Sequence, residues 1–309
     1  MLSVHLENGV VTLRKQPLPR IAQGFARIRM LAAGICSTDL ELQRGYYGFS
    51  GTPGHEFVGE LEDGTRVAGE INLACGHCDW CARGLGRHCP NRTVLGIVKH
   101  PGAFREFLTL PVANLHRVPK SIPTEHAVFI EPVAAACEIL DQIKIAKGTR
   151  VAVLGDGKLG LLIAQVLRAH GASVLLLGRH PEKMRLVDVT GEMLTEKLPL
   201  RQFPIVVDAT GSPKGLRSAI AMCEPRGTVV MKSTVHGLVP IDTAPAIVNE
   251  ITLVGSRCGR FEPALKLLAS GKVRVGNLIS EEFPLDRAPD AFKRATTKGV
   301  LKVLLRPPE

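Results

Sequence analysis

Three residues near the N-terminus combine the side-chain types that bind zinc. Cys36 stands in the segment Gly-Ile-Cys-Ser-Thr-Asp at 34–39, and His55 and Glu56 close the segment Pro-Gly-His-Glu at 53–56. A thiolate, an imidazole and a carboxylate form a mixed ligand set that this borderline-soft ion accepts. Cys36 and His55 are too far apart to share one face of a helix, so only two folded loops could bring them together. The alternative is a buried cysteine and an ordinary loop histidine.

A second group consists of four cysteines crowded between residues 75 and 89. They are half of the chain's eight cysteines and stand at Cys75, Cys78, Cys81 and Cys89. In a reducing compartment this spacing indicates a metal in preference to disulfides. Four thiolates can fold around one tetrahedral ion and leave no open position, so the spacing predicts a structural zinc. Free or redox-active thiols are the alternative.

A glycine-rich turn between a strand and a helix predicts a dinucleotide site. Residues 151–154 read as a buried strand, apolar residues from 159 onward recur at helical spacing, and 173–177 read as a second strand. In this context a G-x-G-x-x-G turn lets the backbone approach a pyrophosphate, and the helix N-terminus faces the phosphates. The turn comprises Gly155, Gly157, Lys158, Leu159 and Gly160.

The end of the second strand bears on the choice between NAD and NADP. An NAD site places Asp or Glu there to bind the ribose 2′-hydroxyl, whereas this chain has Gly178, Arg179 and His180. A glycine leaves room for a 2′-phosphate, and a guanidinium can bind it. The sequence therefore favours NADP over NAD and predicts that Gly178→Asp reverses the preference. The alternative is that Arg179 only points to solvent.

The second half of the chain alternates predicted strands and helices, which is typical of a parallel, doubly wound sheet. Residues 181–203 are too few and too polar for a full strand–helix unit with its connections, so we expect that side of the sheet to be abbreviated. The predicted elements are strands at 205–208, 228–231 and 251–254, and helices at 213–223 and 262–269.

Glu131 is a carboxylate in an otherwise apolar stretch. It stands near the start of a helix predicted over residues 127–143 and is followed by Pro132, which fits a first helical turn. A carboxylate among apolar residues needs a partner, and a metal is one candidate. Solvent at the start of the helix is the other.

Composition and charge exclude several classes of protein. The chain has 309 residues, enough for two domains, and is 45% hydrophobic. No apolar run approaches the roughly 18 residues of a membrane span, and the N-terminus lacks a signal pattern, so we expect a cytoplasmic protein without a membrane partner. The net charge of +10 comes without a block of basic residues. We therefore expect an evenly basic surface and no nucleic-acid partner.

Taken together, the motifs resemble the zinc-containing medium-chain dehydrogenase/reductase family of alcohol, polyol and threonine dehydrogenases. The resemblance implies an α/β protein with two domains. A GroES-like, β-rich catalytic domain would comprise residues 1–119 and 275–309, with the structural zinc lobe at 75–89. A Rossmann domain with a doubly wound parallel sheet would comprise residues 120–274. The similar segments are 34–39, 54–56, the four-cysteine lobe, Glu131-Pro132, the turn at 155–160, Ala209–Ser212 and the closing strands.

The resemblance also implies roles for individual residues and two zinc ions per chain. Cys36, His55 and an acidic residue, Glu56 or Glu131, would hold the catalytic ion, and the two carboxylates could alternate. Thr38 would pass the alcohol proton outward, and Asp39 would hold the histidine ligand. Further positions expected to contact the cofactor are Thr210, Gly211, Ser233 and Ser256.

The activity implied by the resemblance is hydride transfer between NADP(H) and a small alcohol or polyol, or the corresponding aldehyde or ketone. Glu41 departs from the family, which often has a proton-relay histidine at this position. The family also suggests a homodimer or homotetramer. The alternative is a non-catalytic regulatory protein that binds zinc and a dinucleotide. That alternative explains the cysteine lobe but not Cys36, Thr38 and His55 in register.

Overall fold

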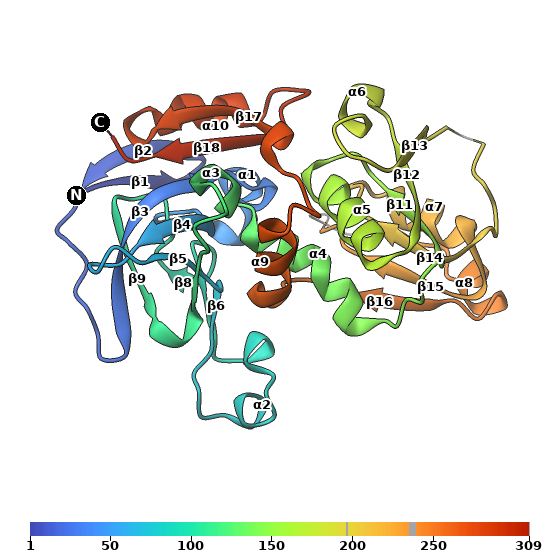
Figure 1. The fold of residues 1–309 in the computed structure, drawn as a ribbon, viewed down its shortest axis with the longest axis horizontal. Coiled ribbons are helices and arrows are strands. Elements are labelled where there is room, and N and C mark those ends of the chain that lie inside the picture. The colour runs from blue at the N-terminus through green and yellow to red at the C-terminus, as the bar shows by residue number, and fades with distance from the viewer. Residues whose placement is uncertain (196, 235–238, 309) are drawn as a thin grey trace. The chain divides into compact units, whose positions relative to one another are not determined.

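The chain divides into two compact units (Figure 1). The computed structural model describes residues 1–309 except 196, 235–238 and 309, and it leaves the side chain of Tyr47 undescribed. Unit 1 comprises Met1–Glu131 and Val275–Glu309, and unit 2 comprises Pro132–Arg274. The sequence prediction placed the first boundary earlier, at 119/120, and the second at 274/275. Unit 1 is therefore closed by the C-terminal segment of the chain.

Unit 1 is built on a seven-stranded sheet in the order β10-β5-β4-β3-β18-β17, with β9 also paired to β3. β17 and β18 are parallel, and the other neighbours are antiparallel. The C-terminal strand β18 thus lies against β3 near the N-terminus. The strands are β3 (Phe25–Gly34), β4 (Glu56–Glu60), β5 (Arg66–Gly69), β9 (Phe107–Pro111), β10 (Leu115–Arg117), β17 (Ile279–Pro284) and β18 (Lys302–Arg306).

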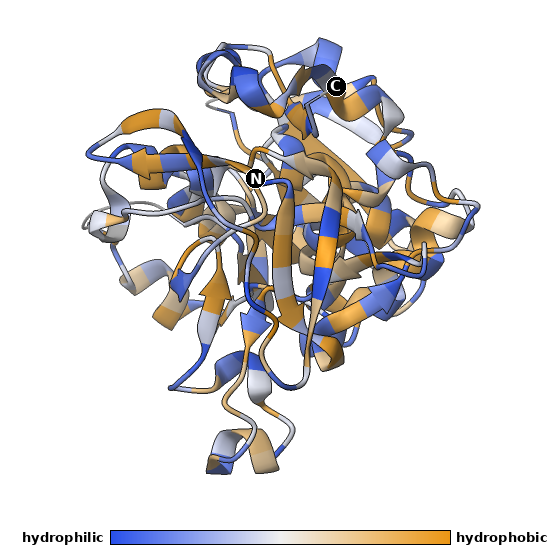
Figure 2. Ribbon diagram, turned by 90° about the vertical axis from the view of Figure 1, so that its left-hand side faces the viewer, coloured by the Kyte–Doolittle hydropathy of each residue, from blue (hydrophilic) through white to orange (hydrophobic). Residues whose placement is uncertain are grey.

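The strands of this sheet are rich in apolar residues, and some strands have alternating buried positions whereas others are buried along most of their length. Figure 2 shows hydrophobic residues concentrated along its strands, and in β18 the residues from Lys302 to Leu305 are all buried. On the core side, the rings of Phe104 and Phe292 meet edge to face with centroids 5.9 Å apart, a favoured aromatic geometry. Phe292 comes from helix α10 (Ala288–Ala295). The sheet is thus a rigid support for the loops at its ends.

Smaller elements surround the sheet. β1 (Leu2–Glu7) and β2 (Val10–Lys15) form an antiparallel pair, and β6 (Asn72–Leu73), β7 (Thr93–Leu95) and β8 (Lys99–His100) form a third sheet. The helices and 3₁₀ turns are α1 (Ser37–Gln43), η1 (Tyr46–Gly48), α2 (Asp79–Ala82), η2 (Gly86–His88), η3 (Val112–Asn114), α3 (Thr124–Ala127), η4 (Gly276–Leu278) and η5 (Leu285–Arg287). The segment that carries α2 and η2 leaves the sheets through β6 and returns through β7 (Figure 1).

Unit 2 contains a six-stranded parallel sheet in the order β13-β12-β11-β14-β15-β16. This Rossmann-like sheet, together with unit 1, confirms the predicted α/β fold class. The strands are β11 (Arg150–Leu154), β12 (Ser173–Gly178), β13 (Thr190–Met193), β14 (Phe203–Asp208), β15 (Cys223–Met231) and β16 (Thr252–Gly255). The helices are α4 (Ile130–Gln142), α5 (Lys158–His170), α6 (Pro181–Met184), α7 (Gly215–Met222), α8 (Ala244–Val248) and α9 (Phe261–Ala269).

This side of the sheet is abbreviated, as the sequence predicted. Residues 181–203 contain a short helix, α6, and a short strand, β13, which pairs in parallel with β12. Both elements have only four residues, and every residue of β13 is exposed. An edge strand can be short and polar because only one of its sides makes backbone hydrogen bonds, so a low apolar content does not exclude it.

The helix after the glycine-rich turn packs as its pattern predicts. In α5 the residues from Gly160 to Leu167 are buried, and Gly171, with φ of +105°, ends the helix in the left-handed conformation. Among the described residues, none of the helices has the length and apolar character that a membrane crossing requires.

Candidate functional site

The folded loops of unit 1 bring Cys36, His55 and Glu56 together. One potential ligand atom from each of the three lies within 4.8 Å of the others, and both His55 and Glu56 are buried. Cys36 is the N-cap residue of α1, and Glu56 is the first residue of β4. The group therefore joins a helix start to a strand start. A thiolate, an imidazole and a carboxylate this close fit the coordination shell of zinc.

Asp39 connects the two loops that carry this group. Its carboxylate accepts a hydrogen bond from the Cys36 backbone N–H at 2.8 Å and another from the Gly54 N–H at 3.1 Å. The His55 Nδ1 lies 3.5 Å from the same carboxylate. Since Nδ1 faces Asp39, the Nε2 atom is left for a metal. Burial would lower the pKa of His55, but the negative charges of Asp39 and Cys36 outweigh it and raise that pKa well above its usual value.

Thr38 and Glu131 are placed differently from the three grouped residues. The Thr38 hydroxyl is 3.8 Å from the Cys36 sulfur and is partly exposed. Glu131 is outside the described set whose ligand atoms lie within 4.8 Å of one another. Its charge nevertheless acts on Lys302, a buried residue that is ion-paired with Glu56. The structure therefore groups Glu56, rather than Glu131, with Cys36 and His55.

The four cysteines of the lobe converge on one point. The sulfur–sulfur distances are 3.9 Å for Cys75–Cys81, 3.5 Å for Cys78–Cys81, 3.7 Å for Cys78–Cys89 and 3.5 Å for Cys89–Cys75. A tetrahedron with metal–sulfur bonds of about 2.3 Å has edges of about 3.8 Å. The lobe thus matches a zinc site in ligand type, number and spacing. His77 and His88 are exposed, and the His77 amide bonded to Cys75 lowers the pKa of that thiol to about 6.

In unit 2, three glycines shape a cradle before α5. At Gly155, with φ of +111°, a Cβ would lie 2.5 Å from the Ala209 carbonyl oxygen, and a Cβ at Gly160 would collide with the Gly155 carbonyl. At Gly157 a Cβ would meet nothing within 4 Å. The first and third glycines therefore allow close packing, whereas the second leaves open space at the helix N-terminus. This is the arrangement that a pyrophosphate needs.

The end of β12 is organised by Asp156, which we had not singled out from the sequence. Its Oδ2 accepts hydrogen bonds from the Arg179 and His180 backbone N–H groups, both at 2.6 Å, and from the His180 ring at 3.1 Å. Burial would raise the pKa of Asp156, but these hydrogen bonds outweigh it and lower the pKa. The carboxylate therefore fixes the turn that carries the exposed Arg179 side chain.

The position of Asp156 argues against the prediction that Gly178→Asp reverses the cofactor preference. A Cβ at position 178 would lie 2.6 Å from both the Cβ and the Oδ2 of Asp156. Gly178→Asp would therefore displace the turn and place two carboxylates side by side. The substitution cannot simply exchange one cofactor for the other, as the sequence had suggested.

Asp208 gathers most of the remaining predicted cofactor residues at the carboxyl ends of β14 and β15. Its Oδ1 accepts hydrogen bonds from the Thr210 hydroxyl at 2.7 Å and the Ser233 hydroxyl at 3.0 Å. The Gly211 N–H in turn donates to the Ser233 hydroxyl at 2.9 Å. Ser256, after β16, accepts from the buried Lys232 ammonium at 3.1 Å. Ligands bind at this edge of open parallel sheets.

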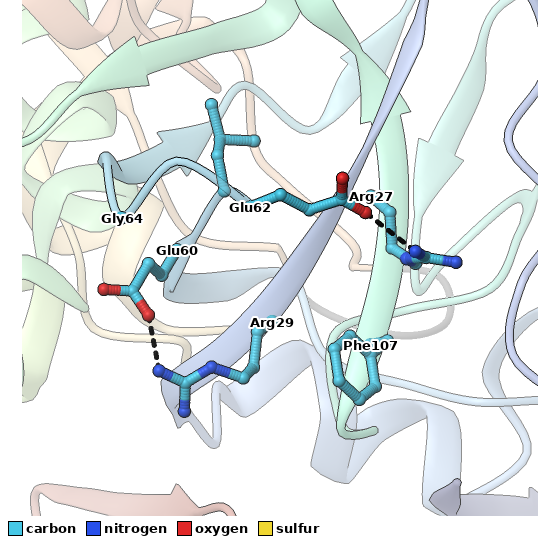
Figure 3. Close-up of a pocket in the computed structure, with 7 residues that line it drawn as sticks. Arg27, Arg29, Glu60, Glu62, Gly64 and Phe107 are labelled. Atoms are coloured by element: carbon cyan, nitrogen blue, oxygen red, sulfur yellow. Dashed lines mark hydrogen bonds and ion pairs between the residues drawn. The ribbon is translucent and has the colours of Figure 1, made fainter.

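Away from these groups, a hollow opens beside the turn at residues 61–64 (Figure 3). It is lined by Arg27, Arg29, Glu60, Glu62 and Phe107, among others. Arg27 pairs with Glu62 at 2.7 Å, and Arg29 pairs with Glu60. The two arginines and two glutamates that line the hollow are therefore paired with one another. None of the residues lining the hollow belongs to the zinc groups or the glycine cradle.

Comparison with known proteins decides the family. Residues 22–120 match the alcohol dehydrogenase GroES-like domain, and residues 159–270 match the zinc-binding dehydrogenase family. An L-threonine 3-dehydrogenase from Streptomyces coelicolor is 31% identical, and the match covers 94% of this chain and 94% of that protein. The chain belongs to the zinc-containing medium-chain dehydrogenase family. The predicted resemblance is confirmed.

Other members of this dehydrogenase family agree with the assignment. A sorbitol dehydrogenase from Halalkalibacterium halodurans is 26% identical, covering 97% of this chain and 96% of its own. The structure of a zinc-binding dehydrogenase from Sinorhizobium meliloti 1021, bound to NADP, is 28% identical over 99% of both chains, with a TM-score of 0.90. The protein is therefore a zinc-dependent, NAD(P)-dependent dehydrogenase that acts on CH–OH groups. The prediction of an enzyme is confirmed, against the non-catalytic alternative.

Proposed function

We propose that this dehydrogenase interconverts a small polyol or related secondary alcohol and its carbonyl compound, with NADP(H) as the preferred cofactor. The observation that carries the proposal is the group of Cys36, His55 and Glu56, whose ligand atoms lie within 4.8 Å of one another and in which His55 and Glu56 are buried. Similar proteins are named for sorbitol, L-galactonate and L-threonine. Each of these compounds carries a secondary hydroxyl beside other polar groups.

Each residue near the site has a task in this proposal. Zinc held by Cys36, His55 and a carboxylate would act as a Lewis acid that makes an alcohol more acidic. Asp39 keeps the Nδ1 side of His55 occupied and fixes the Cys36 loop through its backbone N–H. Thr38, partly exposed and near the Cys36 sulfur, is suited to take up the alcohol proton and pass it to solvent.

A hydride-transfer assay tests the proposal. The zinc-loaded enzyme is incubated with NADP or NAD and a panel of polyols, sugar alcohols, sugar acids and amino alcohols, and the reduced nicotinamide is followed by absorbance. We expect turnover with at least one polyhydroxylated secondary alcohol and a higher kcat/KM with NADP. Turnover only with simple primary alcohols would contradict the proposed substrate class.

Support for NADP comes from the turn after β12. Gly178 presents no side chain there, and the exposed Arg179 is held by its backbone bond to Asp156. A charge-assisted hydrogen bond to a 2′-phosphate contributes about 1.5–3 kcal/mol, or roughly ten- to hundredfold in affinity. We therefore expect Arg179→Ala to weaken NADP binding by that factor and to leave NAD binding nearly unchanged.

The measurement is a fluorescence titration of both cofactors against both proteins. Arg217→Ala serves as a matched control because Arg217 is also an exposed arginine of unit 2, on α7. Equal losses of NAD and NADP affinity in Arg179→Ala would mean that the residue supports the turn rather than the 2′-phosphate. Tighter binding of NAD than NADP by the unmodified enzyme would contradict the preference itself.

Three further expectations stay predictions. The family resemblance suggests a homodimer or homotetramer, which light scattering coupled to size-exclusion chromatography would measure. Two zinc ions per chain would be counted by elemental analysis of the pure enzyme. A cytoplasmic location would be tested by fractionation of the source cells.

A further inference from the structure

Lys302 is a lysine buried at the Cys36–His55–Glu56 group. Its residue exposure is 1%, as is that of Glu56, and its ammonium is ion-paired with the Glu56 Oε2. The same ammonium lies 5.5 Å from the centre of the Phe129 ring, within the range of a cation–π interaction. A lysine is seldom buried so completely unless it is paired, so its place beside a proposed zinc ligand needs a reason.

The strand order explains how the two side chains meet. Glu56 lies on β4 and Lys302 on β18, and β3 lies between them in the sheet. Gly34 of β3 is paired with Glu56 on one side and with Leu304 on the other. A Cβ at Gly34 would lie 2.9 Å from the Glu56 Oε2 and 3.1 Å from the Lys302 Cδ. Because Gly34 has no side chain, there is room across β3 for the side chains of Glu56 and Lys302 to form their ion pair.

Lys302 offsets part of the negative charge around the proposed zinc centre. Cys36 as a thiolate, Glu56, Glu131 and the buried Asp39 would carry four negative charges, against two positive charges on zinc. The Lys302 ammonium reduces this excess from two charges to one. The ion pair with the Glu56 carboxylate and the contact with the Phe129 ring both stabilise a charged ammonium at this buried position.

We propose that Lys302 is a positioning residue that competes with the catalytic zinc for the Glu56 carboxylate and thereby keeps Glu56 a weak, exchangeable ligand. One oxygen of Glu56 is already engaged by the ammonium, which withdraws negative charge from the carboxylate. The ammonium and a zinc ion also repel each other, and in a buried site this repulsion is poorly screened. The proposal rests on the zinc centre described above.

Competition and simple support predict opposite changes in zinc affinity when Lys302 is replaced. Outer partners that only orient a ligand strengthen metal binding, and their loss weakens it about 10- to 100-fold. A competing ammonium does the opposite, so its loss tightens metal binding. Lys302→Met, which keeps a long side chain without the charge, should release zinc about tenfold more slowly to the chelator dipicolinate.

The test is a double-mutant cycle on the zinc-loaded enzyme with Lys302→Met, Glu56→Gln and the double variant. Zinc release is followed with a colorimetric indicator, and cobalt exchanged into the site reports the ligand set by its absorption spectrum. Glu56→Gln should hardly change release when Lys302 is present, but should reverse the slow release of Lys302→Met. The cobalt spectrum should change in Lys302→Met and return towards that of the unmodified enzyme in the double variant.

The double variant guards against a folding failure because it leaves no unpaired buried charge. Its zinc release should be within about threefold of that of the unmodified enzyme, because the variant removes the weak carboxylate ligand together with the ammonium that competes for it. Faster release from Lys302→Met or from the double variant would overturn the competition. His55→Ala tests the zinc centre separately from the role of Lys302: a variant that keeps both zinc ions would overturn the zinc centre itself, and the competition with it.

Discussion

The two candidate zinc groups of unit 1 are held in opposite ways. The four-cysteine lobe has little core of its own: α2 contains no buried residue, and of the four ligands only Cys89 is buried. Cys36, His55 and Glu56, in contrast, stand at the ends of buried strands, and Asp39 and Lys302 bond to their loops and side chains. We therefore expect the lobe to need a metal for stability, and the other group, which is supported by the protein, to be able to leave its metal open to substrate.

The largest effect is expected from His55→Ala. Loss of a ligand at the supported group should remove the exchangeable zinc and, with it, several kcal/mol of Lewis-acid stabilisation. Turnover should fall by at least about a thousandfold, because each 1.36 kcal/mol is tenfold in rate. Metal analysis and steady-state kinetics measure both losses.

The fold should survive this change, because the sheet around the group is formed independently of the metal. Circular dichroism and NADP binding should be nearly those of the unmodified enzyme. If His55→Ala unfolded the protein instead, the contrast between a supported group and a metal-dependent lobe would be wrong.

The opposite pattern is expected from Cys78→Ser. A lobe with three thiolates should lose its zinc and unfold locally, since structural zinc supplies the folding energy of such segments. Limited proteolysis should cut first between residues 75 and 89, and the melting temperature should fall by several degrees. We expect turnover per intact molecule to stay within about threefold of normal, because local unfolding need not reach the rest of the domain. A thousandfold loss of turnover with an uncut lobe would contradict this.

A smaller effect tests the close packing of the supported group. Gly34→Ala would push a methyl group between Glu56 and Lys302, and overpacking of this kind costs about 1–3 kcal/mol. We expect a loss of thermal stability and a reduction in kcat of about tenfold. Gly255→Ala is the control, because a Cβ there meets nothing within 4 Å. Equal behaviour of the two variants would show that the packing at Gly34 is not tight.

Asp39→Asn should change metal affinity without removing a proposed zinc ligand. An amide can still accept one hydrogen bond from the Cys36 or Gly54 backbone, but it removes the charge that faces His55. Loss of such a partner weakens metal affinity about 10- to 100-fold, so zinc should leave faster while the lobe keeps its own. A chelator titration of both variants of the site, Asp39→Asn and His55→Ala, would rank them.

Much of the fold and of the metal chemistry could be predicted because the signals are local. The four cysteines lie within fifteen residues of sequence, so the loops between them are short enough to fold around one ion. The turn at 155–160 is likewise contained between one strand and one helix. Cys36 and His55 required more, because their loops had to be placed by a sheet. Family resemblance, rather than spacing alone, indicated that they meet.

The contacts between distant residues at these sites depend on the tertiary structure and could not be predicted from the sequence. Glu56 and Lys302 are 246 residues apart, and only the order β4-β3-β18 and the small residue at Gly34 let them meet. Asp156 and Gly178 approach each other because β11 and β12 are parallel neighbours. Sequence determines which chemical groups are present and which short loops can close. Strand order and register determine which charged residues, distant in sequence, are paired in the structure. The pairing matters because a buried charge without a partner costs free energy.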